Sequence, residues 1–426
     1  MPRTLYTLLW YAASPLIPIR LWYRGRREPL YRVAIGERFG VYRTRLEHRH
    51  AGTIWIHAVS LGETRAVAPL IERIVRERPD VGIVLTAMTA SGREAGRALY
   101  GDRVMQAWLP YDLPFAIDAF LDRYKPSIGL LMETELWPNL VAACARRGVP
   151  LHLVNARMSA RSAAGYAKFG AVTRSMLASL AGVIAQTDDD ARRLRDLGAE
   201  DVAVVGNLKF DVAVPEDMRA RGAALRERLG RDRQVWLAAS TREGEEVLLL
   251  DTIARAPRSS ALLLLVPRHP QRFDDVERLL RQRGLEHVRK SSGEPVGAST
   301  QVVLGDTMGE MFAYCAAADL AFVGGSLVPL GGQNLIEPIA VGVPALVGPH
   351  TFNFADATER AIDAGAAMRI ADAESLLAAV ASLLGDANAR ERMRSAALGF
   401  VAQHQGAAER TWQRIEPALA KSLAPR

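Results

Sequence analysis

The feature of this sequence that most limits its fold is a rhythm of short apolar runs that alternate with longer helical patterns. The runs are rich in Val, Ile and Leu, and they lie at 53–59, 81–87, 127–133, 149–155, 182–187 and 202–207. Strands with little polar alternation, separated by helices, are typical of a parallel sheet that is covered on both faces. The sequence therefore predicts a doubly wound α/β domain.

After Asn207 the rhythm pauses at a polar stretch around Pro215 and then starts again. The second set of runs lies at 234–240, 261–267, 285–290, 300–306, 320–325 and 343–348. A chain of 426 residues is long enough for two cores. We expect an N-terminal segment at 1–27, a Rossmann-like domain at 28–212 and a second one at 213–426, whose last helix can return to the first. Ligands of open α/β sheets bind at the carboxyl ends of the strands, so the site is expected between the domains.

Positive charge is concentrated near the N-terminus. Residues 1–50 hold ten arginines and three glutamates, and this excess of seven charges equals the formal net charge of the whole chain. A protein that binds nucleic acid more often spreads basic residues over its folded domains, so nucleic acid is not an expected partner.

The stretch 4–19 is uncharged, contains Pro15 and Pro18, and is followed by aromatic residues and arginines. Its sixteen residues fall short of the roughly 20 that a straight membrane-spanning helix needs. Rings at headgroup depth with arginines beside them are typical of an interfacial anchor on an anionic membrane surface. A single span and a plain buried helix remain as alternatives.

The sequence gives no sign of a metal centre or of a disulfide framework. Cys144 and Cys315 are far apart, and the eight histidines form no HExxH-like cluster. We therefore expect a reducing compartment and no protein-bound metal.

The stretch FVGGSLVPLGGQNLIEP (322–338) places four glycines between a predicted strand and a predicted helix. Glycines there let backbone N–H groups approach an anion, and the N–H groups of the helix start add to such a site. The stretch lacks the lysine of a Walker loop and the spacing of GxGxxG. Glu337 could accept hydrogen bonds from two sugar hydroxyls, or could merely complement the helix dipole. The pattern favours a nucleotide-binding turn.

A second stretch, HAVSLGETR (57–65), ends a predicted strand and opens a helix. Ser60 and Glu63 have the spacing of a capping box, in which Glu63 only closes the helix end. A carboxylate at this place can also act as a general base toward a hydroxyl. Both interpretations fit the residues.

Two polar turns of the second domain carry candidate phosphate contacts. Arg268 and His269, in LVPRHPQRF, follow a predicted buried strand, and this position favours phosphate contact. Ser240 and Thr241 also follow a strand and precede a helix, where they supply hydroxyl and N–H donors.

In the first domain, Arg157, Arg161 and Lys168 gather after another predicted strand. An anionic acceptor and a solvated basic face both fit these three residues. Glu133 and Glu135 are two residues apart on a segment expected to be extended. Such carboxylates point to opposite sides, so they are not expected to form one acid–base pair.

Taken together, these motifs resemble the 3-deoxy-D-manno-octulosonic acid (Kdo) transferases, inverting glycosyltransferases with the GT-B fold. The resemblance covers nearly the whole chain and rests on GERFG (36–40), WIHAVSLGE, LPYDLP, ETELWPN, NARMSARS, GNLKFD, PRHPQRF and GGSLVPLGGQNLIEP. It implies CMP-Kdo as the donor and the glucosamine disaccharide of a lipid A precursor (lipid IVA) as the acceptor. It also implies no metal or cofactor, and a location at the cytoplasmic face of the inner membrane.

Carried over to this sequence, the resemblance makes Glu63 the proposed base that takes a proton from the primary hydroxyl of the acceptor. Leu61 stands where the family commonly has valine. Arg157, Arg161 and Lys168 would face the acceptor. The contacts to CMP would come from Ser240, Thr241, Arg268, His269, Gly325, Ser326, Asn334 and Glu337.

Two other functions are compatible with a pair of Rossmann-like domains. A sugar-nucleotide epimerase has a similar build but would not need a membrane-seeking N-terminus. A non-enzymatic solute-binding protein would need an export signal and no base.

Overall fold

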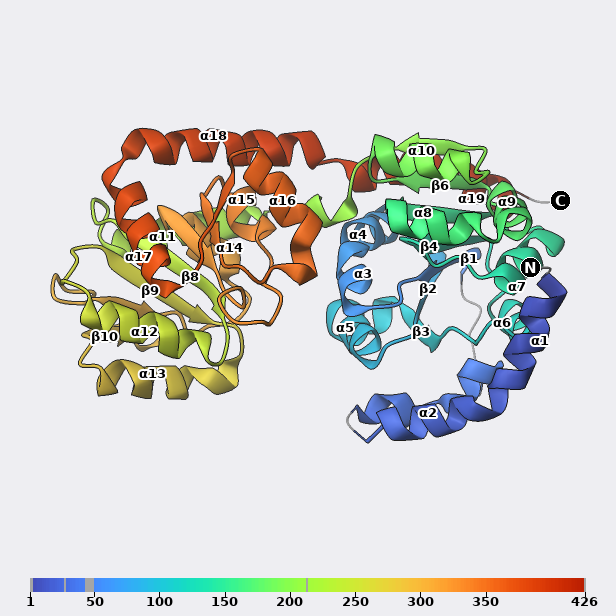
Figure 1. Cartoon of the computed structure of the whole chain (residues 1–426), viewed down its shortest axis with the longest axis horizontal. Coiled ribbons are helices and arrows are strands. Elements are labelled where there is room, and N and C mark those ends of the chain that lie inside the picture. The colour runs from blue at the N-terminus through green and yellow to red at the C-terminus, as the bar shows by residue number, and fades with distance from the viewer. Residues whose placement is uncertain (1–2, 27, 43–49, 212–213, 425–426) are drawn as a thin grey trace. The chain divides into compact units, whose positions relative to one another are not determined.

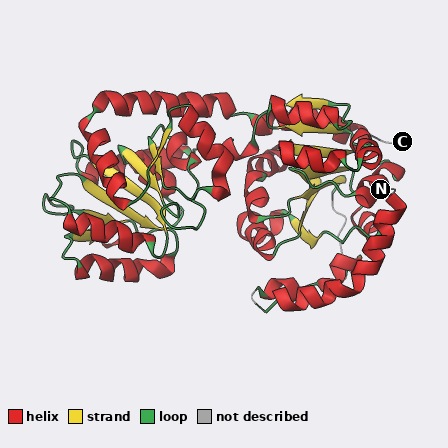
Figure 2. Ribbon diagram, in the orientation of Figure 1, coloured by secondary structure: helices red, strands yellow, loops and turns green. Residues whose placement is uncertain are grey.

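A computed structural model describes residues 3–26, 28–42, 50–211 and 214–424. The chain forms two compact units, one of residues 1–211 with 406–426 and one of residues 212–405. Each unit holds one seven-stranded parallel sheet with helices on both faces (Figures 1 and 2). The prediction of two Rossmann-like α/β domains is confirmed. The expected borders at residue 27 and at 212–213 lie outside the described residues.

The first sheet has the strand order β3-β2-β1-β4-β5-β6-β7, so the chain turns back between β1 and β4. Its strands are β1 (Gly52–His57), β2 (Val81–Ala87), β3 (Met105–Trp108), β4 (Ile128–Met132), β5 (Leu151–Ala156), β6 (Gly182–Ala185) and β7 (Val202–Val204). In sheets of this kind, a ligand-binding crevice lies at the carboxyl ends of the two strands on either side of the turning point. The candidate site of this unit is therefore sought beyond β1 and β4.

Both faces of the first sheet are buried, which explains why its strands lack polar alternation. Ile54 and Ile56 of β1 pack in one core and Trp55 packs in another, on the opposite face. The helices of this unit are α1 (Arg3–Ala13), α2 (Ile17–Arg24), α3 (Leu61–Ala66), α4 (Ala68–Glu77), α5 (Ala90–Tyr100), α6 (Pro114–Tyr124), α7 (Pro138–Arg146), α8 (Ala160–Ala167), α9 (Gly170–Ala178), α10 (Asp188–Asp196) and α19 (Ala407–Leu423). Short 3-10 helices are η1 (Ser14–Leu16), η2 (Pro29–Arg32), η3 (Ile35–Phe39), η4 (Gly101–Arg103) and η5 (Leu208–Phe210).

The second sheet has the strand order β10-β11-β9-β8-β12-β13-β14 and turns back between β8 and β12. Its strands are β8 (Val235–Thr241), β9 (Leu262–Pro267), β10 (His287–Arg289), β11 (Val302–Leu304), β12 (Leu320–Val323), β13 (Ala345–Val347) and β14 (Ala367–Arg369). The helices are α11 (Glu216–Leu229), α12 (Glu245–Arg255), α13 (Phe273–Gln282), α14 (Met311–Ala316), α15 (Ile336–Ala340), α16 (Ala355–Asp363), α17 (Ala373–Gly385) and α18 (Ala387–His404). The 3-10 helices are η6 (Pro270–Arg272), η7 (Lys290–Ser292) and η8 (Phe352–Phe354).

Two strands, β3 and β14, were not expected from the sequence. Each lies at an edge of its sheet and is only three or four residues long. Met105 and Gln106 of β3 are half-buried, and Met368 of β14 is exposed. A short strand at the edge of a sheet is partly exposed to solvent, so its sequence lacks the continuous apolar run that predicts the inner strands.

The last helix, α19, belongs to the first unit. Trp412 and Ile415 pack in the same core as Ile54. The carboxylate of Asp211 accepts hydrogen bonds from the N–H groups of Gly406 (3.0 Å) and Ala408 (2.6 Å) and so satisfies two free donors at the start of α19. The end of the chain is thereby fixed to the first unit.

The GERFG segment (36–40) is a structural link within the first unit. Glu37 forms an ion pair of 3.1 Å with Arg93 of α5 and accepts a hydrogen bond from the N–H of Trp108. The guanidinium of Arg38 lies 3.8 Å from the ring centroid of Trp108 and is almost fully buried. These contacts join η3 to β3 and α5. The segment therefore has a structural role in the first unit.

The N-terminal helices α1 and α2 lie against the first unit by one face only. Ile17 and Leu21 are buried beside Tyr31, and the indole of Trp10 lies 5.8 Å from the ring of Tyr111. Other side chains of these helices are exposed and apolar, namely Leu5, Leu8, Leu9, Tyr11, Leu16, Ile19, Trp22 and Tyr23. Among the residues with described positions, no helix is long and apolar enough to cross a membrane.

Candidate functional site

The candidate site of the first unit is built around Glu63, directly beyond β1. Ser60 caps α3, and its hydroxyl accepts a hydrogen bond from the N–H of Glu63 at 3.4 Å. The carboxylate of Glu63 reaches back and accepts hydrogen bonds from the N–H of Val59 and from the hydroxyl of Ser60, both at 2.8 Å. Ser60 thus caps α3, and the Glu63 carboxylate holds the turn before the helix, so Glu63 has the structural part that one of the two interpretations predicts, although it binds the N–H of Val59 and not that of Ser60.

Glu63 also has the electrostatic properties of a base. Its side chain is buried, with 8% of the residue exposed. Burial, with a smaller contribution from the charges of Glu133 and Glu135, raises the pKa of Glu63 to about 7, although the hydrogen bonds from Val59 and Ser60 act to lower it. A carboxylate with a pKa near neutrality can take up a proton at physiological pH. One side chain can therefore both hold the start of the helix and act as a base, so the two interpretations do not exclude each other.

Glu133 and Glu135 both lie near Glu63, on the turn that follows β4. The expectation of an extended segment is wrong here, because β4 ends at Met132 and Glu133 has a left-handed φ of 59°. Lys209 forms an ion pair with Glu133 at 3.0 Å, and the indole N–H of Trp137 donates to Glu135 at 3.0 Å. Both carboxylates are therefore partnered, and both influence the charge of Glu63.

Two further residues with left-handed backbone mark the carboxyl ends of strands. Asn155 in β5 has a φ of 53° and Ser240 in β8 has a φ of 55°, and the strand register shifts at each. Bulges of this kind redirect the chain and are frequent next to active sites. A non-glycine residue in this conformation costs about 1–3 kcal/mol. Neither bulge was expected from the residue pattern.

The basic residues expected on the acceptor side lie before α8 and along it. Arg157 follows β5 and Arg161 lies in the first turn of α8, so these two are close in the chain at the carboxyl edge of the sheet. Lys168 is at the opposite end of α8, about 10 Å away along a helix with a rise of 1.5 Å per residue. All three are exposed.

The candidate site of the second unit is the glycine-rich turn beyond β12. A Cβ atom on Gly324 would lie 2.6 Å from the backbone of Ser240 and Thr241, so only glycine allows β8 and β12 to approach here. Gly325 has a φ of 70°. The N–H of Gly332 donates to the carbonyl oxygen of Gly325 at 2.8 Å and closes the loop. The glycines thus serve the close approach that their spacing suggests.

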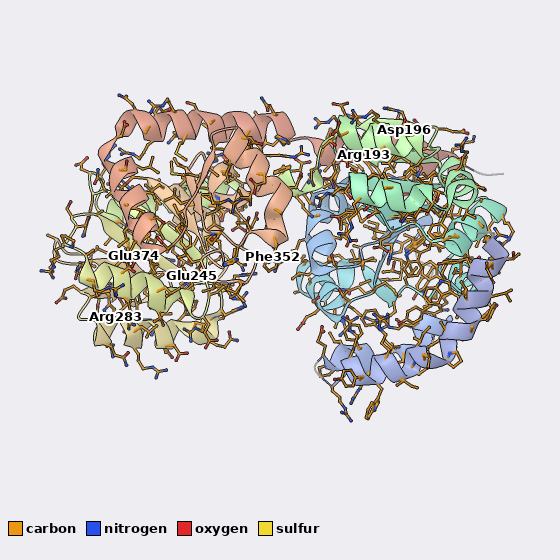
Figure 3. The ribbon with its side chains drawn as sticks, viewed as in Figure 1. Arg193, Asp196, Glu245, Arg283, Phe352 and Glu374 are labelled. Atoms are coloured by element: carbon orange, nitrogen blue, oxygen red, sulfur yellow. The ribbon has the colours of Figure 1, made fainter. Side chains whose placement is uncertain are left out.

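The N–H groups of this turn are not free to bind an anion. Gly325, Ser326 and Leu327 donate their N–H groups to the carboxylate of Glu245, at 2.6, 3.1 and 3.0 Å. Glu245 begins α12 (Figure 3), is fully buried, and also accepts from the N–H of Arg242 at 3.2 Å. The expectation that bare amides of Gly325 and Ser326 bind phosphate is therefore wrong for this conformation, because an internal carboxylate occupies the same donors.

Ser326 is also committed to the fold through its side chain. Its hydroxyl donates to the carbonyl oxygen of Val323 at 2.5 Å and accepts from the N–H of Gly348 at 2.8 Å. Burial raises the pKa of Glu245, against the four N–H donors that stabilise its ionised form. The turn is thus a rigid, internally satisfied structure that can position neighbouring groups.

Positive charge at this edge comes from side chains. The pKa of His269 is lowered by burial and by the charges of Arg242 and Arg268, which places the three groups near one another. Arg242 approaches the glycine turn, since a Cβ on Gly325 would lie 3.4 Å from its Cγ. The N–H of Arg268 donates to the carbonyl oxygen of Thr241 at 2.9 Å. This cluster can meet an anion, and Arg242, in STREGEE, was missed by sequence reasoning.

The remaining candidates lie around α15. The side-chain oxygen of Asn334 accepts from the N–H of Ile336 at 3.1 Å and so supports the start of this short helix. Glu337 is the second residue of α15 and is half-buried, and its charge helps to raise the pKa of the buried thiol of Cys315, chiefly raised by burial. Within the described ranges, no three His, Cys, Asp or Glu residues are grouped to hold a metal ion.

Replacing Glu245 by Gln tests whether this carboxylate holds the glycine turn. The amide group of glutamine would face two backbone N–H donors, so we expect the variant to lose about 2 kcal/mol or more of unfolding free energy in urea. Glu243→Gln, at an exposed position two residues away, is the matched control and should change stability by less than about 0.5 kcal/mol. Equal stability of the two variants would show that the contact is dispensable.

The clustering of positive charge can be measured at His269. In Arg242→Gln, the loss of a neighbouring cation should raise the pKa of His269 toward its ordinary value. NMR titration of the imidazole would follow this shift, and Arg258→Gln, an exposed residue elsewhere in the unit, is the control. An unchanged His269 pKa in Arg242→Gln would place the two groups apart.

Comparison with known proteins assigns the chain to a family. Residues 34–212 match the family model described as 3-deoxy-D-manno-octulosonic-acid transferase (kdotransferase). The 3-deoxy-D-manno-octulosonic acid transferase of Bordetella pertussis is 46% identical, over 98% of this chain and 100% of its own length. The protein of the same description from Haemophilus influenzae is 36% identical, over 99% of this chain and 100% of its own length.

Solved structures show the same fold at low sequence identity. A glycosyltransferase from Rickettsia africae is 13% identical with a TM-score of 0.52, covering 88% of this chain and 100% of its own. A putative UDP-N-acetylglucosamine 2-epimerase from Listeria monocytogenes is 15% identical with a TM-score of 0.52, covering 88% and 98%. A transferase and an epimerase thus share this architecture, and the fold alone does not distinguish the two functions. The relatives that match over their whole length do distinguish them, and the chain belongs to the Kdo transferase family of glycosyltransferases.

Proposed function

We propose that this Kdo transferase moves Kdo from CMP-Kdo to the glucosamine disaccharide of a lipid A precursor (lipid IVA), with Glu63 as the general base. The observation that carries the proposal is the position of Glu63: a buried carboxylate with a pKa of about 7, held beyond β1 where the sheet turns back. In the proposed reaction, Glu63 takes the proton of the acceptor hydroxyl while that oxygen attacks the anomeric carbon of Kdo and CMP departs. Inversion at that carbon follows from a single displacement.

Several features of Glu63 suit this task. The hydrogen bonds from Val59 and Ser60 fix the carboxylate in one orientation, so little entropy is lost when it meets the acceptor. The negative charges of Glu133 and Glu135 make the proton more strongly held once it is taken up. The departing phosphate of CMP needs little protonation, so one carboxylate suffices, whereas glycoside hydrolases need a second one for an alkoxide.

On the donor side, we propose that side chains rather than backbone amides meet the phosphate of CMP. Arg242 and Arg268 carry full charges beside His269, and guanidinium groups bind phosphate oxygens in a fork geometry. Fixed cations can stabilise the charge that develops on the phosphate without a metal ion or other cofactor. Ser240, Thr241 and Asn334 line the neighbouring turns, and Glu337 is proposed to accept hydrogen bonds from the ribose.

We propose further that α1 and α2 attach the protein to the cytoplasmic face of the inner membrane. Leu8, Ile19 and Trp22 are each more than half exposed. Arg26 stacks on the indole of Trp22 at 4.2 Å and brings a cation to the depth of the lipid headgroups. An enzyme held at the surface would meet an acceptor whose acyl chains are embedded there. This supports a transferase acting on a lipid.

The donor and acceptor can be tested together by mass spectrometry. Purified protein incubated with CMP-Kdo and lipid IVA should add the mass of one or more Kdo residues to the lipid. Reactions with another nucleotide sugar, or with a water-soluble glucosamine disaccharide, are the controls. Absence of Kdo on lipid IVA, with transfer to some other acceptor, would contradict the proposed acceptor.

The role of Glu63 can be separated from its capping role with one substitution. Glutamine is accepted in a capping box but is no base, so Glu63→Gln should stay folded and bind CMP. We expect its Kdo transfer, followed by the same mass measurement, to fall by at least about 10².

The matched control is Ser60→Ala, which removes the cap partner and leaves the carboxylate. It should lose about 1 kcal/mol of stability while its transfer falls much less than that of Glu63→Gln. Transfer by Glu63→Gln within a factor of a few of the parent enzyme would end the assigned role.

Membrane attachment can be measured by sedimentation with lipid vesicles. Replacing Leu8, Leu9 and Ile19 by Ser removes three exposed apolar side chains, and vesicle binding should fall by at least about tenfold. Leu99→Ser, an exposed apolar position on α5, is the control and should bind like the parent protein. Equal binding by both variants would argue against α1 and α2 as the anchor.

A further inference from the structure

A pocket of about 390 Å³ lies between α1 and the helices α6 and α7 of the first unit. It is distinct from the residues around Glu63, because its lining comes from the N-terminal helix and from the outer surface of α7. The residues that line it are Arg3, Thr4, Thr7, Leu8, Tyr11, Pro114, Asn139, Ala143 and Arg146. Nothing in the proposed transfer reaction uses this pocket.

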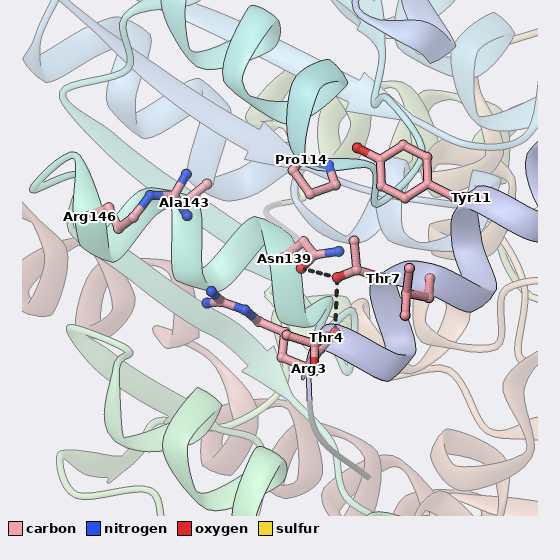
Figure 4. A pocket seen from close by; sticks show the side chains of 9 residues that line it. Arg3, Thr4, Thr7, Tyr11, Pro114, Asn139, Ala143 and Arg146 are labelled. Carbon is pink, nitrogen blue, oxygen red and sulfur yellow. Dashed lines mark hydrogen bonds between the residues drawn. The ribbon is translucent and has the colours of Figure 1, made fainter.

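One end of the pocket is cationic. Arg3 and Arg146 line it from α1 and α7, and Figure 4 shows their side chains extending toward the same end. Arg146 also forms a pair of 3.3 Å with Asp118, whose side chain is partly exposed and is shared with Arg147. No acidic residue is among those that line the pocket, so the two guanidinium groups give this end of it a positive charge that can attract an anion.

The other end of the pocket is apolar and opens on the exposed face of α1. Leu8, with 64% of its surface exposed, belongs both to the pocket lining and to that exposed apolar face. The ring of Tyr11 stacks on that of Phe115, which is also exposed, with centroids 6.4 Å apart. A molecule in the pocket would therefore have its charged part near the arginines and its apolar part among side chains proposed to enter the bilayer.

The walls of the pocket are held in place by buried polar contacts. The hydroxyl of Thr7 donates to the side-chain oxygen of Asn139 at 3.0 Å. The carboxylate of Asp112 accepts from the hydroxyl of Tyr6 and from the N–H groups of Asn139 and Leu140 at the start of α7. Helix α1 is thus joined to α7 by Thr7 and to the loop before α6 by Tyr6.

We propose that this pocket binds the phosphate headgroup of an anionic phospholipid of the membrane, with the phosphate at Arg3 and Arg146 and the acyl chains passing Leu8 and Tyr11. The assignment rests on the proposed membrane attachment of α1 and goes beyond it, because it names a discrete lipid site. Such a site would fix the angle at which the first unit lies on the bilayer. The enzyme would then distinguish anionic membranes from neutral ones by binding, and not only by overall charge.

The test uses the full chain and monomeric short-chain phosphatidylglycerol, below the concentration at which it forms micelles, in a calorimetric titration. We expect one lipid bound per chain. Arg3→Gln with Arg146→Gln should weaken this binding by at least about tenfold, from the loss of two cations near the phosphate. Thr4→Trp, which fills the pocket without changing charge, should weaken it as much.

The charge-matched control is Arg20→Gln with Arg24→Gln, which removes two arginines of α2 and should leave the titration within about twofold of the parent. If this control and the pocket variants weaken binding equally, the effect is general charge and the proposal fails. It also fails if inorganic phosphate binds as tightly as the phospholipid. A raised KM for the lipid acceptor in the pocket variants, with unchanged phosphatidylglycerol binding, would instead assign the pocket to the acceptor.

This titration is independent of membrane attachment. Binding of the monomeric lipid by a protein that does not sediment with vesicles would refute the anchor and leave the pocket standing. If vesicle binding depends on Leu8, Leu9 and Ile19, and the monomeric lipid does not bind at the two arginines, the anchor stands and the pocket proposal is refuted.

Discussion

The structure of the candidate active site depends on one short-range interaction, the cap that Ser60 and Glu63 form at the start of α3. The helix begins directly beyond β1, where the first four N–H groups of a helix lack partners within it. By accepting from Val59 and Ser60, Glu63 closes the turn and brings its own carboxylate to the edge where the sheet turns back. The same burial that makes the cap stable raises the pKa of Glu63. The burial of Glu63 thus accompanies both its hydrogen bonds to the turn and its raised pKa.

The second unit uses a carboxylate at the equivalent turning point with a different result. Glu245 receives four backbone N–H groups and is fully enclosed, whereas Glu63 receives one and keeps a small exposed area. An enclosed carboxylate with four donors organises a loop and cannot meet a substrate. The positive charge at the carboxyl edge of the second sheet therefore comes from Arg242 and Arg268, which lie beside the turn that Glu245 holds. The two units share an architecture, and their two carboxylates differ in how many backbone donors surround them.

Much of this could be predicted from the sequence where the deciding contacts are local. The two sheets follow from apolar runs buried on both faces, and the place of Glu63 follows from a strand followed by S-x-x-E. Glu245 could not be found this way, because a glutamate in STREGEE resembles an exposed residue and its partners lie some eighty residues later in the chain. The left-handed backbone of Glu133 and Ser240 was hidden for a similar reason. Those residue types do not favour that conformation, and only the surrounding sheet imposes it.

The central claim is that Glu63 is at once a helix cap and a base that titrates near neutrality. Its most direct test is the pKa of the Glu63 carboxyl group in the free protein, measured by carbon-13 NMR with labelled glutamate and assigned by its absence in Glu63→Gln. The account predicts a resonance that titrates with a pKa of about 7. A Glu63 carboxyl that titrates near the ordinary value for glutamate, roughly 4.3, would contradict it.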